Sequence, residues 1–271
     1  MLKQRVITAS VLMLGFLSLL FLSPWFVFVA VIAGVFAIGA WEWANLSGLI
    51  STWARLAYTL FIAALAVAFF YFSSFAAETA LTAKATIVAC TWWAVALLWV
   101  QSYPASSVLW RPKWVRLFMG GLVLLPALFS VAWLRQQANG IELILFALLL
   151  VAAADSGAYF SGRAFGKGKL APAVSPGKTW AGVWGGLLLS LLVGLAYGYF
   201  VLALSLPFLL VLIPPVALVS VLGDLLESML KRERGIKDSG SILPGHGGVL
   251  DRLDGVVAAI PLLVLVLAHA S

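Results

Sequence analysis

The stretch PFLLVLIPPVALVSVLGDLLESML, residues 207–230, decides the class of fold. A helix needs about 20 mostly apolar residues to cross the hydrocarbon core of a bilayer, and this stretch supplies them while carrying Asp224 and Glu227. Hydrophobic residues make up 63% of the chain and charged residues 10%, whereas soluble domains average about 25% charged residues. The sequence therefore predicts an all-α, polytopic integral membrane protein.

Apolar stretches of similar length recur along the rest of the chain, and together they predict about nine transmembrane helices. We expect a single membrane domain over 1–271, in which the helices of 1–135 are structural and those of 141–271 carry the functional site. The first run follows Lys3 and Arg5 but is long and lacks a small-x-small cleavage site, so we expect a retained helix rather than a signal peptide. The predicted spans lie near 6–22, 25–44, 55–74, 82–100, 117–134, 141–160, 181–203, 207–230 and 250–269.

The basic residues predict the orientation of these helices. With nine spans, all of the 17 lysines and arginines except Lys84 and Arg135 fall on one side of the membrane. The positive-inside rule makes that side cytoplasmic, so we expect a cytoplasmic N-terminus. Because the segment before the first span is short, we expect the cell inner membrane rather than an organelle. The net charge of +7 is spread over membrane loops, which argues against nucleic acid as a partner.

Acidic residues concentrate near the C-terminal end. Of the ten in the chain, six lie between Asp224 and Asp254. A carboxylate inside a membrane helix costs roughly 2.5–3.5 kcal/mol, so Asp224 and Asp254, both inside predicted spans, should have a partner and a use. Ion pairs with Arg232 or Arg252 that only lock two helices are the alternative, but the convergence of several acidic and basic residues on one short segment favours a site.

The spacing of these residues indicates the chemistry of the site. Asp251 and Asp254 are three apart at the start of a helix, so their carboxylates should share one face about 5–6 Å apart. Carboxylate oxygens suit a hard cation such as magnesium, and the number of ions stays open. The basic residues between the acidic pairs suit phosphoryl chemistry. Glycines on both sides of His246, just before a helix start, predict backbone amides that approach an anion.

A second glycine-rich and basic segment runs from Asp155 to Trp180. Its Gly177-Lys178-Thr179 resembles the end of a P-loop, but that motif needs a glycine where Pro172 stands, and no strand is predicted before it. We therefore expect a phosphate-binding loop that leads into a helix rather than a P-loop.

Three runs in the C-terminal part together resemble the signature of phosphatidate cytidylyltransferases, also called CDP-diacylglycerol synthases: SMLKR at 228–232, KDSG at 237–240 and LPGHGGVLDRLD at 243–254. The segments 155–159 and 175–180 are also similar, so the resemblance covers roughly residues 150–260. Ala181 departs from the resemblance, because in these enzymes a polar or acidic residue often follows the Lys-Thr-x sequence at this position.

The resemblance implies a magnesium-dependent enzyme that converts CTP and phosphatidic acid into CDP-diacylglycerol and pyrophosphate. It also implies a homodimer in the lipid bilayer and a polar cavity open to the cytoplasm and to lipid. With this reaction, we assign the metal centre to Asp224, Asp251 and Asp254, and phosphate binding to Lys231, Arg232 and Lys237. Supporting or substrate contacts are expected from Ser228, His246, Arg252, Asp155 and Lys178.

Two other classes of function compete with this interpretation. Another CTP-using membrane enzyme, acting on an isoprenoid-ether lipid or a polyprenol, would need similar residues. A secondary transporter would also use intramembrane aspartates, but it predicts charges at the bilayer midplane, whereas here they gather at one membrane face. A scaffold gives no reason for intramembrane carboxylates.

Overall fold

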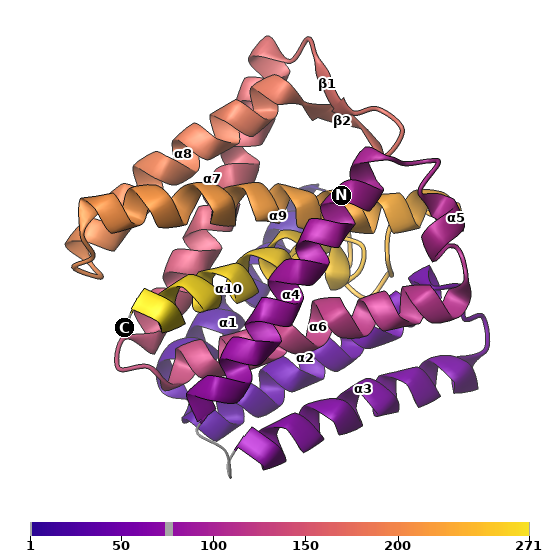
Figure 1. Ribbon diagram of the computed structural model, residues 1–271, viewed down its shortest axis with the longest axis horizontal. Coiled ribbons are helices and arrows are strands. Elements are labelled where there is room, and N and C mark those ends of the chain that lie inside the picture. Colours follow the sequence, from indigo (N-terminus) through magenta and orange to yellow (C-terminus); the bar gives the residue numbers. More distant parts are fainter. Residues whose placement is uncertain (1, 74–77, 271) are drawn as a thin grey trace.

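Helices make up almost all of the regular structure. The computed structural model describes residues 2–73 and 78–270, and Figure 1 shows the arrangement of its elements. The helices are α1 (Leu2–Leu22), α2 (Trp25–Leu46), α3 (Thr52–Ser73), α4 (Glu78–Gln101), the short α5 (Ser107–Trp110), α6 (Lys113–Gln136), α7 (Gly140–Phe165), α8 (Trp180–Phe200), α9 (Leu206–Arg234) and α10 (Leu250–Ala270). The strands β1 (Lys169–Ala171) and β2 (Ser175–Thr179) form an antiparallel hairpin.

Each of the nine predicted spans coincides with a long helix. The ends differ slightly: the span 181–203 runs past the end of α8, and Ser74, at the end of the span 55–74, lies outside the described residues. In the part of the chain that the structure describes, seven helices are long and apolar enough to cross a membrane, namely α2, α3, α4, α6, α7, α8 and α9. The chain is therefore an all-α, multi-pass membrane protein, while nine crossings and the side of the N-terminus stay predictions.

The two remaining long helices differ from the seven in a simple way. The apolar part of α1, Val6–Leu22, is shorter than a full span. The first turns of α10 carry Asp251, Arg252 and Asp254, so charge occupies the beginning of an otherwise apolar helix. This charged beginning is one side of the candidate site.

Helices α9 and α10 run between two groups of helices. Figure 1 shows α7 and α8 packed together on one side, with α2, α3 and α6 on the other. The buried residues of α8 recur every four positions and are all small, which lets α7 and α8 approach closely; they are Gly182, Gly186, Ser190, Gly194 and Gly198. The core of the molecule therefore surrounds the α9–α10 pair.

The crossing of α9 and α10 requires a glycine. A Cβ atom at Gly223 would collide with the backbone oxygen of Asp254, so the backbones touch at this point. Asp224, the next residue, is thereby brought beside Asp254. Helix α9 has 29 residues and is about 44 Å long at 1.5 Å per residue. It is thus longer than a hydrocarbon core of about 30 Å, and its charged last turns can extend beyond that core.

The hairpin is a correction to the predicted loop, because no strand was predicted in this segment. Strand pairing joins Lys169 to Thr179 and Ala171 to Ser175, and Val174 between the strands is buried in the core. The Thr179 side chain accepts a hydrogen bond from the Gly182 amide and so caps α8. Lys178 lies within β2 rather than in a loop, which agrees with the rejection of a P-loop.

Candidate active site

Among the residues that the structure describes, Asp251 at the start of α10 is the carboxylate with the most hydrogen bonds. Its Oδ1 atom lies 2.7 Å from the Lys231 ammonium of α9. The amide of Gly248 donates to Oδ2 over 2.7 Å, and the Ser239 amide and hydroxyl donate to the same oxygen over 3.0 Å each. Both oxygens of Asp251 are therefore supplied with donors by the chain itself.

Lys231 joins Asp251 to a second buried carboxylate. Its ammonium also lies 3.2 Å from Glu227 Oε1, one turn earlier on α9. The side chains of Lys231 and Glu227 are 13% and 4% exposed. Lys231, predicted to bind phosphate, thus serves here as the counter-ion of two buried carboxylates, which would each be costly without it.

Asp224 forms a more open ion pair with the hairpin. Lys178 Nζ lies 2.7 Å from Asp224 Oδ2, and the two side chains are 23% and 35% exposed. The Ser228 hydroxyl donates to Asp224 Oδ1 over 3.1 Å, because residues four apart lie on one face of a helix. The structure therefore brings residues 178 and 224, which the sequence places far apart, into direct contact.

Asp254 lies between these two ion pairs. Its Oδ1 accepts a hydrogen bond from the Gly255 amide over 2.8 Å, and it interacts electrostatically with Asp224, Lys178 and Lys231. Asp155 of α7 interacts electrostatically with Lys178, Asp224 and Arg252. It therefore belongs to the same group of charges. Carboxylates from three helices and lysines from the hairpin and α9 thus share one small region.

The other predicted residues lie at the edge of this region. Arg232 donates from Nε to the Val174 backbone oxygen of the hairpin over 3.1 Å. Arg252 donates to the backbone oxygen of His246 over 3.0 Å and 3.3 Å, so His246 is held by its main chain. Lys237 is exposed and makes no ion pair with any residue that the structure describes.

The predicted anion site at the start of α10 exists, and its anion is a carboxylate of the chain. Glu42 of α2 accepts from the Val249 amide over 3.0 Å and from the Leu250 amide over 2.8 Å. These amides are therefore engaged by a carboxylate of the chain and are not free for a ligand anion.

Three buried residues beside Asp251 were not among the predicted site residues, namely Glu42, Glu227 and Ser239. The sequence contains a signal for Glu42, because it is an acidic residue inside the predicted span 25–44, and the cost of burying it there applies as it does to Asp224. Glu42 lies far along the chain from the charged segment, so its contact with that segment could not be predicted from local spacing. Glu227 lies within the span 207–230, three residues from Asp224, and the same reasoning would have found it.

The carboxylate oxygens of the site suit a hard cation, although Lys178 and Lys231 form ion pairs with some of them. Among the described residues, no group of three or more His, Cys, Asp or Glu side chains stands in a metal-binding arrangement. Asp224 and Asp254 are adjacent oxygen donors of like charge, a combination that magnesium accepts. Asp251 has its acceptor positions filled, so it can join such a set only by exchanging the ammonium of Lys231.

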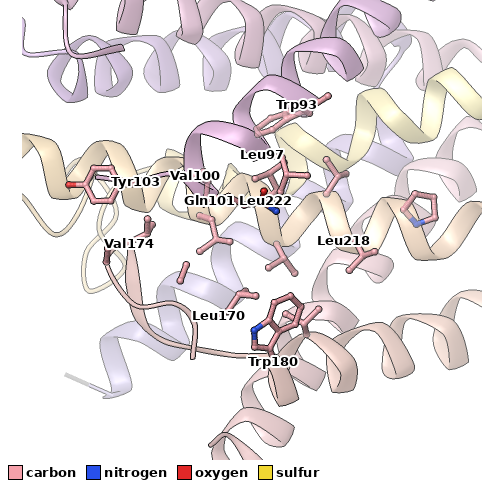
Figure 2. A pocket seen from close by; sticks show the side chains of 18 of the residues that line it. Trp93, Leu97, Val100, Gln101, Tyr103, Leu170, Val174, Trp180, Leu218 and Leu222 are labelled. Carbon is pink, nitrogen blue, oxygen red and sulfur yellow. The ribbon is translucent and has the colours of Figure 1, made fainter. Parts of the chain in front are cut away.

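An apolar cavity of about 620 Å³ lies beside the Lys178–Asp224 pair. Figure 2 shows Trp93, Leu97 and Val100 of α4 facing Leu218 and Leu222 of α9, with Leu170, Val174 and Trp180 closing the remaining side. Val221, whose backbone oxygen accepts from Lys178 Nζ over 3.4 Å, also lines it. The arrangement can therefore hold a molecule with an anionic head and an apolar body.

Comparison with known proteins extends over the whole chain. Residues 3–270 match the sequence profile of the Cytidylyltransferase family. The chain is 47% identical to a phosphatidate cytidylyltransferase of Pseudomonas aeruginosa, over 100% of this chain and 98% of that protein. It is 40% identical to a phosphatidate cytidylyltransferase of Haemophilus influenzae, over 96% of each. The similarity thus extends over α2 as well as over the segment from α9 to α10.

Proposed function

This chain belongs to the Cytidylyltransferase family, and on that premise we propose that it transfers the cytidylyl group of CTP to phosphatidic acid. The products are CDP-diacylglycerol and pyrophosphate. The observation that carries the choice of lipid acceptor is the apolar cavity directly beside the Lys178–Asp224 pair. A phosphate head can lie at the charged groups while acyl chains occupy the cavity, and the relatives named phosphatidate cytidylyltransferases favour phosphatidic acid over other lipid phosphates.

The reaction needs positioning and charge neutralisation more than proton transfer. An oxygen of the lipid phosphate forms a bond to the α-phosphorus of CTP. The bond from that phosphorus to the oxygen that bridges to the β-phosphate breaks, and pyrophosphate leaves with the electron pair. A phosphate monoester is already an anionic nucleophile, so no strong general base is required.

The basic side chains that remain accessible are the proposed phosphate ligands. Lys178 is partly exposed and bound to one carboxylate only. Arg252 and Arg232 use part of their guanidinium groups for backbone oxygens, which leaves donors for substrate, and Lys237 is exposed. Lys231 contributes by holding Asp251 and Glu227 in place, and Asp155 of α7 adds negative charge near Lys178 and Arg252.

We further propose that the enzyme is magnesium-dependent, with Asp224 and Asp254 as the principal ligands and Asp251 as the third member of the centre. Such a cation would neutralise phosphate charge during the transfer. Both substrates are anionic, and the carboxylates of the site would repel them without this compensation. The proposal also includes a homodimer in the cell inner membrane with the site open to the cytoplasm, where CTP is available.

Detergent-purified protein, incubated with CTP, magnesium and phosphatidic acid, tests the proposal. We expect equal amounts of pyrophosphate and CDP-diacylglycerol, and loss of both when magnesium is omitted and EDTA added. A panel of acceptors with an isoprenoid-ether lipid phosphate and a polyprenol separates the other CTP-using enzymes. Preference for one of those acceptors would contradict the lipid assignment, and unchanged turnover in EDTA would contradict the metal assignment.

A further inference from the structure

The contacts of Glu42 place an acidic residue of α2 beside the hydroxyl group that also contacts Asp251. Glu42 is 2% exposed and Ser239 is 1% exposed. The Ser239 hydroxyl lies 3.3 Å from Glu42 Oε2 and 3.0 Å from Asp251 Oδ2. One buried hydroxyl group thus stands between the two carboxyl groups.

Glu42 also fixes the beginning of α10, on which Asp251 and Asp254 stand. The first amides of a helix have no partner within the helix, and a carboxylate near them is stabilised by the helix dipole. Here Val249 and Leu250 donate to the two different oxygens of Glu42. The carboxyl group therefore holds both the residue before α10 and its first residue from a helix that is distant in the sequence.

Two glycines of the C-terminal segment keep space free for this side chain. A Cβ atom at Gly240 would collide with Glu42 Oε1. A Cβ atom at Gly248 would collide with the Ser239 hydroxyl and lie 2.7 Å from both Glu42 oxygens. The glycines at these positions thus have a physical reason that the charged segment alone does not reveal.

We propose that Glu42 is a positioning residue of the active site, which sets the place of Asp251 through Ser239 and through the first amides of α10. This inference rests on the proposed function, because Asp251 matters for turnover only if its site carries the reaction. Glu42 does not touch the substrates. It makes α2 a part of the catalytic framework.

The substitution Glu42→Gln tests the inference with little change of volume. A glutamine offers one acceptor oxygen, and its amino group meets a backbone amide that is itself a donor. We expect kcat to fall by about 10- to 100-fold, as with lost outer partners of site ligands, with KM values for CTP and phosphatidic acid within about twofold of wild type.

Ser239→Ala separates the two routes, because it removes the hydroxyl link while the contacts of Glu42 with α10 remain. We expect a smaller loss of kcat, and we expect the double variant to lose less than the two single losses combined, since both residues act on the position of Asp251. If Glu42→Gln does not fold, Glu42→Asp tests the same contacts, because its carboxylate is one methylene shorter and retracts from the Val249 and Leu250 amides, and a wild-type kcat in that variant overturns the inference.

Trp43→Phe is the matched control on the same helix. It removes the hydrogen bond of 2.7 Å from the indole to the Arg116 backbone oxygen, so it weakens the attachment of α2 to α6 without touching Glu42. We expect a lower unfolding temperature and an unchanged kcat. An equal loss of kcat in this control would show that any loosening of α2 lowers turnover, and would overturn the specific role of Glu42.

Hydrogen exchange of the segment 238–252 gives a measurement that does not depend on activity. In Glu42→Gln the amides of Val249 and Leu250, which donate to Glu42, should exchange about tenfold faster or more, the effect of a lost hydrogen bond to a charged group. Faster exchange with unchanged kcat leaves only a helix cap and overturns the inference. If wild-type protein makes no CDP-diacylglycerol, the proposed function fails, and the exchange data still decide whether Glu42 orders the Asp251 segment.

Discussion

Asp251 and Asp224 both pair with a lysine over 2.7 Å, but their surroundings differ. The Lys231–Asp251 side chains are 13% and 8% exposed, and the Lys178–Asp224 side chains are 23% and 35% exposed. Asp251 accepts from two backbone amides and a hydroxyl group, whereas Asp224 accepts from one serine in addition to its lysine. The first pair is built into the framework of the site, and the second can exchange its partners for a ligand.

This difference explains how one site can be both rigid and able to bind highly charged substrates. A buried, saturated carboxylate keeps its position because moving it would leave several donors without partners. A half-exposed ion pair is worth little, so a phosphate or a cation can replace one member at small cost. The apolar cavity adjoins the exchangeable pair, as expected if that side receives the lipid.

The largest effect should come from Lys231→Met. This change leaves Asp251 and Glu227 without their shared counter-ion, and breaking a buried pair costs about 3–5 kcal/mol. Thermal unfolding in detergent measures the loss, and Lys178→Met is the matched control with an expected cost of about 1 kcal/mol or less. Equal losses in the two variants would mean that the pairs do not differ as described.

Asp224→Asn should lower turnover rather than stability. We expect kcat to fall by about 100- to 1,000-fold, the range for losing one group that stabilises charge in the reaction, with an unfolding temperature close to wild type. CDP-diacylglycerol formation measures the change. Glu233→Gln, on the same helix but paired with Arg111, should keep its activity, and a well-folded Asp224→Asn with wild-type turnover would refute the role of Asp224.

Filling the cavity should affect the lipid substrate alone. Leu218 lines the cavity and is 44% exposed, so Leu218→Trp can place a large side chain in it. We expect the KM for long-chain phosphatidic acid to rise about tenfold, because part of the apolar burial of the acyl chains is lost, while the KM for CTP stays the same.

The control for this change is Val211→Trp, which lies on the same helix outside the cavity lining and is 73% exposed. A phosphatidic acid with short acyl chains should be less sensitive to Leu218→Trp. If the KM for CTP rises as much as that for the lipid, the cavity is not an acyl-chain site.

The smallest effect is expected for Arg111→Ala. Its ion pair with Glu233 spans 2.8 Å, but the Arg111 side chain is 68% exposed, and such pairs contribute about 0.2–1 kcal/mol. The unfolding temperature should fall only slightly, and by less at high salt. A loss as large as that in Lys231→Met would show that the exposure of an ion pair does not predict its contribution to stability.

The helices and most of the charged segment could be predicted from the sequence. Long apolar runs have one stable form in a bilayer, because each backbone group must be hydrogen-bonded within its own helix, so all nine predicted spans fall on helices. The pairing of Asp224 with Ser228 also follows from helix geometry alone. The hairpin at 169–179 was not predicted, since its two short strands lack an alternating apolar pattern, and the burial of Val174 sets its position.

By itself, the sequence determined that this is a helical membrane protein whose acidic and basic residues concentrate near its C-terminal end, because hydropathy and local spacing act over a few turns of chain. Only the tertiary structure decided the partner of each charge. It assigned Lys231 to Asp251 and Glu227, Lys178 to Asp224, and Glu42 to the first amides of α10. These choices depend on which helices cross and how closely, and contacts between residues as far apart as 42 and 250 leave no local pattern in the sequence.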